Sequence, residues 1–231
     1  MKRALIAALS VCAFFSSPAL AQPAQNAPLL DGAAIIGPPP TPGSFGAVAD
    51  RAGEGLPVSP ERVALASRDQ GANNYPDPWQ AFAPVLGQHF TAAQYPATAR
   101  LLAAITSQVG PVAGPTKERF QRQRPYVAEP QLARCTPAPT DGLGPYRSYP
   151  SGHSTLGYAW ALALAEVSPA HAQTLLERGV DYGQSRVICG VHWPSDVMAG
   201  RVLAAAIIAR LHGDDAFRRL LDEARRELRS L

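Results

Sequence analysis

Lysine is almost absent from this sequence of 231 residues. It occurs only at Lys2 and Lys117, so arginine supplies nearly all of the 21 basic side chains, and 18 acidic residues balance them. A nucleic-acid-binding domain needs clustered cations on a strongly basic surface. A formal net charge of +3 does not meet that need, so the composition argues against a nucleic-acid partner.

Charged residues and long hydrophobic runs are scarce as well. Only 17% of the residues are charged, whereas 46% are apolar. That apolar fraction is ordinary for a globular protein and argues against disorder. The most apolar stretches beyond the N-terminus, 154–165 and 202–209, end well before the ~20 residues that a membrane-spanning helix needs. The sequence therefore predicts no membrane insertion.

Residues 1–21 have the three-part form of a secretory signal peptide. Lys2 and Arg3 precede an uncharged apolar run that is too short to be an uncleaved membrane anchor, and a small-residue triplet ends at Ala21. We therefore expect cleavage after Ala21 and export to the periplasm. Removal of the two N-terminal cations leaves 19 of the 21 basic residues against 18 acidic ones, and Lys117 becomes the only lysine.

Cysteine is equally rare, with three residues in the chain. Cys12 lies in the expected signal peptide, which leaves Cys135 and Cys189 as a pair in an oxidising compartment, where disulfides form. A bond between them would close a loop of about 54 residues and stabilise the fold by roughly 4 kcal/mol through chain entropy. Two buried free thiols are the alternative. Neither cysteine lies in a metal-ligand spacing, so the sequence predicts no metal site.

The chain shows no alternating pattern typical of β-strands and no internal repeat. Residues 22–57 are rich in proline, glycine and alanine and lack a sustained periodicity, so we expect an N-terminal arm that is extended or partly ordered. Helix signals recur from residue 58 onward. They predict one all-α domain over 58–231, a single-domain helical bundle around a buried central helix.

Several local signals indicate where helices begin and end. Ser59, Asp77 and Ser168 each precede a proline, which is the pattern of an N-cap followed by proline at the first helical position. The segment 154–167 is apolar nearly all round and is therefore expected to be the buried central helix. Another helix carries one apolar face and is expected to end at Gly110. That face consists of Leu101, Leu102, Ile105 and Val109.

The first of three clusters that carry chemistry has the pattern K-x6-R-P. Lys117 and Arg124 are seven residues apart, so on a helix they would point within roughly 20° of each other, with Arg119 and Arg122 on the far side. Pro125 disfavours helical geometry at Arg124 and would place that guanidinium at a mouth. Two converging cations suit a phosphate group. A solvated basic face is the alternative.

The second cluster is Pro150-Ser151-Gly152-His153, which leads directly into the apolar helix. Backbone N–H groups at a helix start, a hydroxyl and a glycine that permits close approach together make an anion-binding site. His153 would lie in the first turn, within reach of the bound anion. An ordinary helix cap is the alternative.

The third cluster has the pattern S-R-x5-H-x3-D. His192 and Asp196 are four residues apart at the start of a helix that Pro194 opens, and Arg186 adds a third cation. Asp196 can accept a hydrogen bond from one ring nitrogen of His192, which leaves the other nitrogen as a nucleophile. A capping aspartate and half of a metal site are the alternatives. Three further histidines belong to no cluster and are expected at the surface: His89, His171 and His212.

In this order the three patterns resemble the phosphatidic acid phosphatase type 2 (PAP2) superfamily, which includes vanadium haloperoxidases and glucose-6-phosphatase. More closely, residues 148–153 and 183–190 are similar to the bacterial class A non-specific acid phosphatases, and the similarity covers about residues 36–228. Two positions depart from that subfamily. Arg147 stands where it usually has glycine and Ser154 where it usually has threonine, so pocket shape and substrate preference are affected, and not the reaction.

The resemblance implies a helical, metal-independent phosphomonoesterase that needs no cofactor, forms homo-oligomers and acts on small molecules such as nucleotides, sugar phosphates and aryl phosphates. It leaves open whether phosphate is also transferred to alcohols. By motif position, His192 is the nucleophile that forms a phosphohistidine, Asp196 orients it, and His153 protonates the leaving alcohol. The residues that would hold the phosphoryl oxygens are Lys117, Arg124, Ser151, Gly152 and Arg186.

Two other functions fit parts of the same pattern. A vanadium-dependent haloperoxidase would hold vanadate with the same cations, but the short chain and the match over residues 183–190 disfavour it. A non-catalytic phosphate-binding protein would have no need for a nucleophile oriented by a carboxylate, so the His192 and Asp196 pair disfavours it. An assay of halide oxidation with added vanadate separates the first alternative from a phosphatase.

Overall fold

We describe the chain from a computed structural model. The description covers residues 29–53, 56–71, 76–132, 135 and 144–230. All regular elements of these residues are helical, which confirms the all-α prediction. The expected signal peptide, 1–21, lies outside the described residues.

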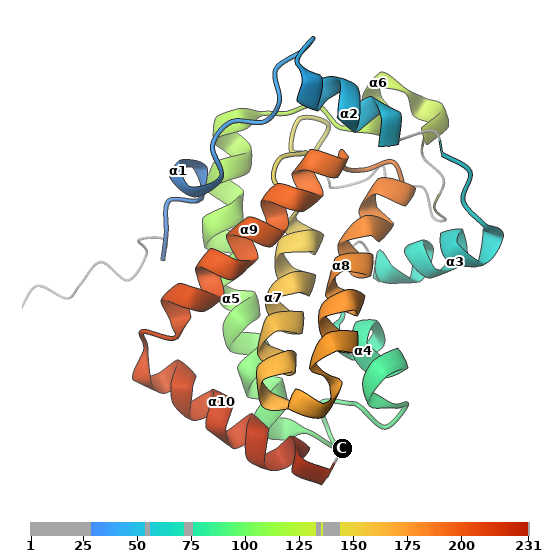
Figure 1. Ribbon diagram of the computed structural model, residues 1–231. Helices are drawn as coiled ribbons and strands as arrows, with labels where there is room; N and C mark the ends of the chain where they lie inside the picture. The colour runs from blue at the N-terminus through green and yellow to red at the C-terminus, as the bar shows by residue number, and fades with distance from the viewer. Residues whose placement is uncertain (1–28, 54–55, 72–75, 133–134, 136–143, 231) are drawn as a thin grey trace, which may run out of the picture.

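The helices follow one another along the chain as Figure 1 shows. They are α1 (Gly32–Ile36), α2 (Phe45–Gly53), α3 (Pro60–Asp69), α4 (Pro78–Leu86), α5 (Pro96–Phe120), α6 (Pro125–Ala128), α7 (Gly152–Val167), α8 (Ala172–Ile188), α9 (Pro194–Leu211) and α10 (Asp215–Glu227), with short 3-10 turns η2 (Pro130–Leu132), η3 (Pro169–His171) and η4 (Leu228–Ser230). None of the helices in the described part of the chain combines the length and hydropathy that a membrane span requires.

Helix α7 is the buried central helix that the sequence predicts (Figure 1). It packs mainly against α8 and α9, and also against α5 and α10. Two glycines allow α7 and α8 to lie close together. A Cβ atom on Gly157 would overlap the Tyr182 ring, and one on Gly179 would overlap the Cβ of Ala161. The helix therefore forms a rigid core element whose N-terminus is held in place by its neighbours.

The prediction that a helix ends at Gly110 is wrong. Helix α5 continues through Pro111 and Pro115 to Phe120, for 25 residues in all. Its buried face also continues, with Val112, Ala113 and Thr116 in the interior. Burial of this second half outweighs the poor helix propensity of glycine and proline, so tertiary packing decides the length. As a result, Lys117 lies in the last turn of α5.

The N-terminal arm contains two short helices that the sequence does not predict. Asp31 caps α1 by accepting hydrogen bonds from the amides of Ala33 and Ala34. Helix α1 packs against α5 and α9, and α2 packs against α9. The side chain of Asp50 in α2 is buried. The described part of the arm is thus an ordered wrap on the bundle.

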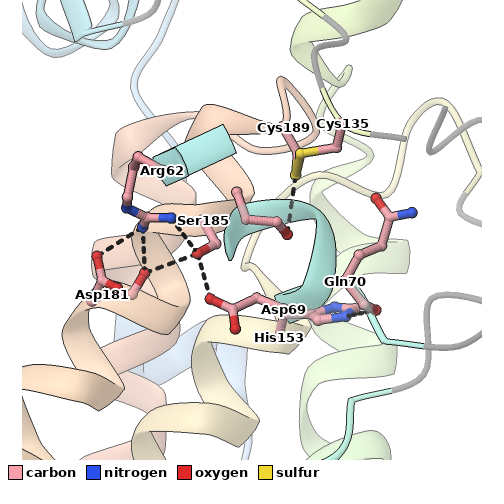
Figure 2. The surroundings of a disulfide bond; sticks show 9 residues. Arg62, Asp69, Gln70, Cys135, His153, Asp181, Ser185 and Cys189 are labelled. Carbon is pink, nitrogen blue, oxygen red and sulfur yellow. Dashed lines mark hydrogen bonds and ion pairs between the residues drawn. A yellow bond between two sulfur atoms is a disulfide. The ribbon is translucent and has the colours of Figure 1, made fainter. Parts of the chain in front are cut away.

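The predicted helix caps are partly present. Ser59 accepts a hydrogen bond from the Arg62 amide at the start of α3, and Asp77 caps α4 in the same way. Ser168 makes no side-chain cap, because the chain forms the 3-10 turn η3 there before α8 begins. The predicted disulfide between Cys135 and Cys189 is present and lies at the end of α8 (Figure 2).

Candidate active site

The three sequence clusters meet at one end of the bundle, the end that α2 covers (Figure 1). Lys117 lies in the last turn of α5 and Arg186 in the last turn of α8. Residues 151–153 begin α7, and Asp196 lies in the first turn of α9. Four helix ends thus bring together side chains that are up to 79 residues apart in sequence, from 117 to 196.

Lys117 and Arg124 converge, but not along one helix. The Lys117 ammonium donates to the carbonyls of Pro150 and Arg147, the latter at 2.9 Å, and Nη2 of Arg124 donates to the same Arg147 carbonyl at 3.0 Å. Because α5 ends at Phe120, Arg124 lies beyond it in extended backbone. The expectation that its guanidinium lies at a mouth is wrong, since the side chain is buried. Desolvation, with the charge of Arg124, lowers the pKa of Lys117 to about 7.

The start of α7 is fixed by Ser151. Its hydroxyl accepts a hydrogen bond from the Ser154 amide at 3.3 Å, and its own amide donates to the Asp196 carbonyl at 3.0 Å. Gly152 follows beside Lys117, so that a Cβ there would lie 3.9 Å from Lys117 Cε. The amides of Gly152 and His153, between those of Ser151 and Ser154, have no acceptor within their own helix and are available to an anion.

The His192 ring lies between a carboxylate and a guanidinium. Its Nδ1 is 3.4 Å from Oδ2 of Asp196, and its Nε2 is 3.1 Å from Nη1 of Arg124. Because Arg124 is a donor, Nε2 must accept, which assigns the ring proton to Nδ1. Asp196 also caps α9 by accepting from the Trp193 amide at 2.8 Å. One carboxylate therefore orients the ring and caps the helix.

His153, the second histidine of the three clusters, is also buried. Its Nε2 is 3.1 Å from the Gln70 carbonyl at the end of α3 (Figure 2). Its ring stacks on that of Tyr182. Desolvation lowers the pKa of His153 well below 6.5, with the charge of Arg186 as the next cause and the Gln70 carbonyl acting in the other direction. In the free protein this imidazole is therefore neutral.

The pKa of His192 is also well below 6.5. Desolvation is the largest cause, and the charges of Arg124, Lys117 and Arg186 follow in that order. Since each of these three cations acts on the same imidazole, they all lie near it. The arrangement keeps His192 neutral, with the lone pair on Nε2, where Arg124 donates to it.

Arg186 is the least satisfied group of the site. Its side chain is 0% exposed, and its Nε and Nη1 atoms have no hydrogen-bond partner among the described residues. Desolvation lowers the pKa of Arg186 to about 10, so the guanidinium remains charged. A buried cation with unmet donors is unfavourable unless an anion accepts from it. The described residues contain no group of histidines, cysteines or carboxylates that could hold a metal ion.

Sequence reasoning missed three residues of the site. Arg122, expected on the far side, donates to Oδ1 of Asp196 at 2.5 Å and to Asp50 at 2.7 Å. Ser148 donates to Oδ2 of Asp196 at 2.5 Å. The helical projection failed for Arg122 because α5 ends before it. The neighbouring motif could have indicated Ser148, whereas no local signal marks Asp50.

The two positions that depart from the resembling subfamily have different surroundings. The Arg147 guanidinium pairs with Glu118, which is 62% exposed. The main-chain carbonyl of Arg147 accepts the hydrogen bond from Lys117. Ser154 is buried and donates to the Val197 carbonyl at 2.8 Å, which joins α7 to α9. The three isolated histidines lie outside the site, exposed or half-buried: His89, His171 and His212.

Comparison with known proteins agrees with the resemblance that the three sequence motifs carry. The PAP2 superfamily matches residues 96–218. An acid phosphatase of Zymomonas mobilis is 42% identical over 168 residues, which are 72% of this chain and 62% of that protein. A non-specific acid phosphatase of Providencia stuartii is 36% identical over 217 residues, 90% of this chain and 84% of that protein.

A third relative is the non-specific acid phosphatase of Salmonella typhimurium, 40% identical over 148 residues, which are 64% of this chain and 59% of that protein. The chain thus spans less than two thirds of the Zymomonas and Salmonella proteins, and more than four fifths of the Providencia protein.

Proposed function

This chain belongs to the PAP2 superfamily, and we propose that it is an acid phosphatase that hydrolyses phosphate monoesters through a phosphohistidine on His192. The observation that carries the proposal is the buried Arg186 guanidinium, whose Nε and Nη1 need acceptors. A phosphate group offers oxygens in the geometry that a guanidinium fork prefers. Lys117 and Arg124 lie near the same imidazole and add positive charge around it.

The first chemical step is attack by His192. Its neutral Nε2 forms a bond to phosphorus while the bond between phosphorus and the ester oxygen breaks, and His153 gives a proton to the leaving alcohol. The low pKa of His192 supports its role as nucleophile. His153 must be protonated, and a bound phosphate dianion raises its pKa toward that state. Activity is therefore expected to rise toward acid pH.

The second step hydrolyses the phosphohistidine. His153 takes a proton from water, the water oxygen bonds to phosphorus, and the bond between phosphorus and Nε2 breaks, which regenerates neutral His192 and releases phosphate. Phosphoryl transfer needs mainly positioning and neutralisation of charge. Lys117, Arg124 and Arg186 would neutralise that charge, and the Ser151 hydroxyl with the first-turn amides of Gly152 and His153 would position the phosphoryl oxygens.

Substrate range, location and assembly are part of the same proposal. The residues assigned above bind the phosphoryl group and not the alcohol, which supports a broad range that includes nucleotides, sugar phosphates and aryl phosphates. The signal-like segment 1–21 supports export to the periplasm. The class A resemblance supports a homo-oligomer. Transfer of phosphate to alcohols would follow if an alcohol replaced water in the second step.

A direct test compares His192→Ala with His171→Ala, which changes a histidine outside the site. Hydrolysis of 4-nitrophenyl phosphate and trapping of acid-labile phosphate on the protein are measured at pH 5. Loss of both in the His192 variant, with both retained in the His171 variant, is the expected result. Turnover by His192→Ala, or activity that EDTA abolishes and a divalent metal restores, contradicts the proposed mechanism.

A further inference from the structure

We propose that Arg122 is a positioning residue, which holds the Asp196 carboxylate in the place where it orients His192, and that Asp50 of the N-terminal arm holds Arg122 in turn. This inference rests on the proposed function, because it assigns a role in the turnover of that same site. It also makes helix α2 part of the catalytic apparatus through a residue that acts on Arg122.

The Arg122 guanidinium bridges two carboxylates. Its Nη1 donates to Oδ1 of Asp196 at 2.5 Å and to Oγ of Ser195 at 2.7 Å, and its Nη2 donates to Oδ2 of Asp50 at 2.7 Å. The guanidinium carbon lies 6.0 Å from the centre of the Tyr149 ring and 5.6 Å from that of the Trp193 ring. The side chain is 12% exposed, so protein groups on all sides restrict its motion.

Asp50 anchors the arrangement from the other side. Its Oδ1 accepts from the Ser195 amide at 2.8 Å, and its Oδ2 accepts from the Ser195 hydroxyl at 2.7 Å as well as from Arg122. A carboxylate of α2 thereby caps the first turn of α9 beside Asp196. Each carboxylate is favourable at a helix N-terminus. The guanidinium between them offsets their mutual repulsion.

The distances around Asp196 indicate what sets its position. Its contact with His192 Nδ1 is 3.4 Å, whereas Arg122, Ser148 and the Trp193 amide bind it at 2.5, 2.5 and 2.8 Å. The short bonds fix the carboxylate, and the imidazole adapts to it. Arg122 is the charged member of this group, and a planar fork can serve two carboxylates at once where an ammonium could not.

The arm contributes a second restraint to the same region. Tyr149, whose ring lies beside the Arg122 guanidinium, donates from its hydroxyl to the Ile36 carbonyl of α1 at 3.2 Å. Both helices of the arm therefore hold the surroundings of Arg122. A change in the arm is expected to alter the orientation of His192 without any change in the groups that bind phosphate.

The experiment measures steady-state hydrolysis of 4-nitrophenyl phosphate and inhibition by inorganic phosphate for Arg122→Gln and Asp50→Asn. A small displacement of a reacting group lowers the rate by about 10- to 100-fold. We expect a fall in kcat of that size for both variants. The inhibition constant of phosphate should stay within about threefold of the wild-type value, because Lys117, Arg124 and Arg186 are unchanged.

Glu227→Gln is the matched control. Glu227 also caps a helix from another element, since it accepts from the amides of Ala97 and Thr98 at 2.9 and 2.8 Å and from the Thr98 hydroxyl at 2.8 Å. Like Asp50→Asn, its substitution removes a carboxylate charge and retains one amide oxygen as acceptor. It lies at the opposite end of the bundle, where α10 meets the start of α5 (Figure 1). The Glu227→Gln variant should lose thermal stability to a degree similar to that of Asp50→Asn and keep the kcat of the wild type.

A second readout follows the ring itself. Nitrogen-15 NMR of labelled histidine should report the proton of His192 on Nδ1 in the wild type. In the two variants Arg124 still donates to Nε2 and keeps the proton on Nδ1, so we expect a shift of the Nδ1 resonance as its hydrogen bond to Asp196 changes, and no such shift in Glu227→Gln. If Arg122→Gln does not fold, Asp50→Asn still tests the inference, since it leaves Arg122 and one acceptor for the Ser195 amide in place.

The possible outcomes are distinct. With an active wild type, three results overturn the inference and leave the proposed function intact. The variants keep their kcat, their kcat falls no more than that of Glu227→Gln, or they lose phosphate affinity in place of kcat. A wild type that hydrolyses no phosphate monoester overturns the proposed function itself.

Discussion

Replacement of Arg186 by methionine should make the protein more stable and inactive at the same time. The side chain is 0% exposed, and two of its donors have no partner among the described residues. An unmet buried donor costs about 1–3 kcal/mol, and even a paired buried charge replaced together with its partner by apolar side chains is often neutral or gains about 1–4 kcal/mol. After the loss of some packing, we expect a net gain of about 1–3 kcal/mol for Arg186→Met in phosphate-free buffer.

Phosphate should reverse this order of stability. A ligand at 1,000 times its dissociation constant stabilises the folded state by about 4.1 kcal/mol, and only the wild type would bind it. For a domain of this size 1 kcal/mol shifts Tm by about 2–4 °C. The variant should therefore melt roughly 2–12 °C above the wild type without phosphate and below it at saturating phosphate.

The assay is thermal unfolding by calorimetry at several phosphate concentrations. Arg178→Met is the control, because Arg178 is a buried arginine of the same helix whose donors are satisfied. It donates to the Ala81 carbonyl at 2.8 Å and pairs with Asp69. Its removal leaves a buried carboxylate without its cation and should destabilise the fold by about 3–5 kcal/mol.

Two results would refute the reasoning about Arg186. One is a variant that is less stable than the wild type in phosphate-free buffer, which would mean that the guanidinium is already compensated in the free protein. The other is an equal rise of Tm with phosphate in both proteins, which would place the phosphate elsewhere.

Two further predictions concern titration. Lys117, with a pKa of about 7, is roughly half unprotonated at pH 7, whereas an ordinary lysine is only about 0.03% unprotonated. Competitive acetylation followed by mass spectrometry should therefore show that the reactivity of Lys117 rises with a midpoint near pH 7 and that phosphate suppresses the reaction. A midpoint near pH 10 would contradict this prediction. Because the pKa values of His153 and His192 are lowered below 6.5, the unfolded chain binds more protons there, and stability should fall as pH drops below that value, by up to about 1.4 kcal/mol per pH unit for each histidine. Chemical denaturation of wild type and His192→Asn between pH 5 and 8 measures this, and a difference between the two that does not change with pH would refute it.

Local signals predicted the parts of the fold that depend on neighbouring residues. Ser59 and Asp77 cap helices because a cap needs only a short side chain and the next few amides. The apolar run after His153 becomes the central helix because nothing in it requires water. The motifs around these elements could be assigned to one site because their order along the chain resembles that of the PAP2 superfamily, whereas each motif alone also fits a cap or a solvated face.

Contacts between distant segments decided the rest. Helix α5 passes Pro111 and Pro115 because its second half is buried against the bundle, a gain that no local propensity contains. Helices α1 and α2 have 5 and 9 residues, too few to be stable alone, and they depend on packing against α5 and α9. Asp50 and Arg122 meet across such a contact, so neither could be assigned from its own sequence surroundings.

The shared acceptor of Lys117 and Arg124 has a consequence for enzyme engineering. Both cations bind the main-chain carbonyl of Arg147, which every amino acid provides, while the Arg147 guanidinium points to Glu118 at the surface. Position 147 is therefore a place where side chains can be exchanged beside the site without loss of the carbonyl that both cations bind. A saturation library at this one codon offers a route to new ester preferences on an unchanged catalytic framework.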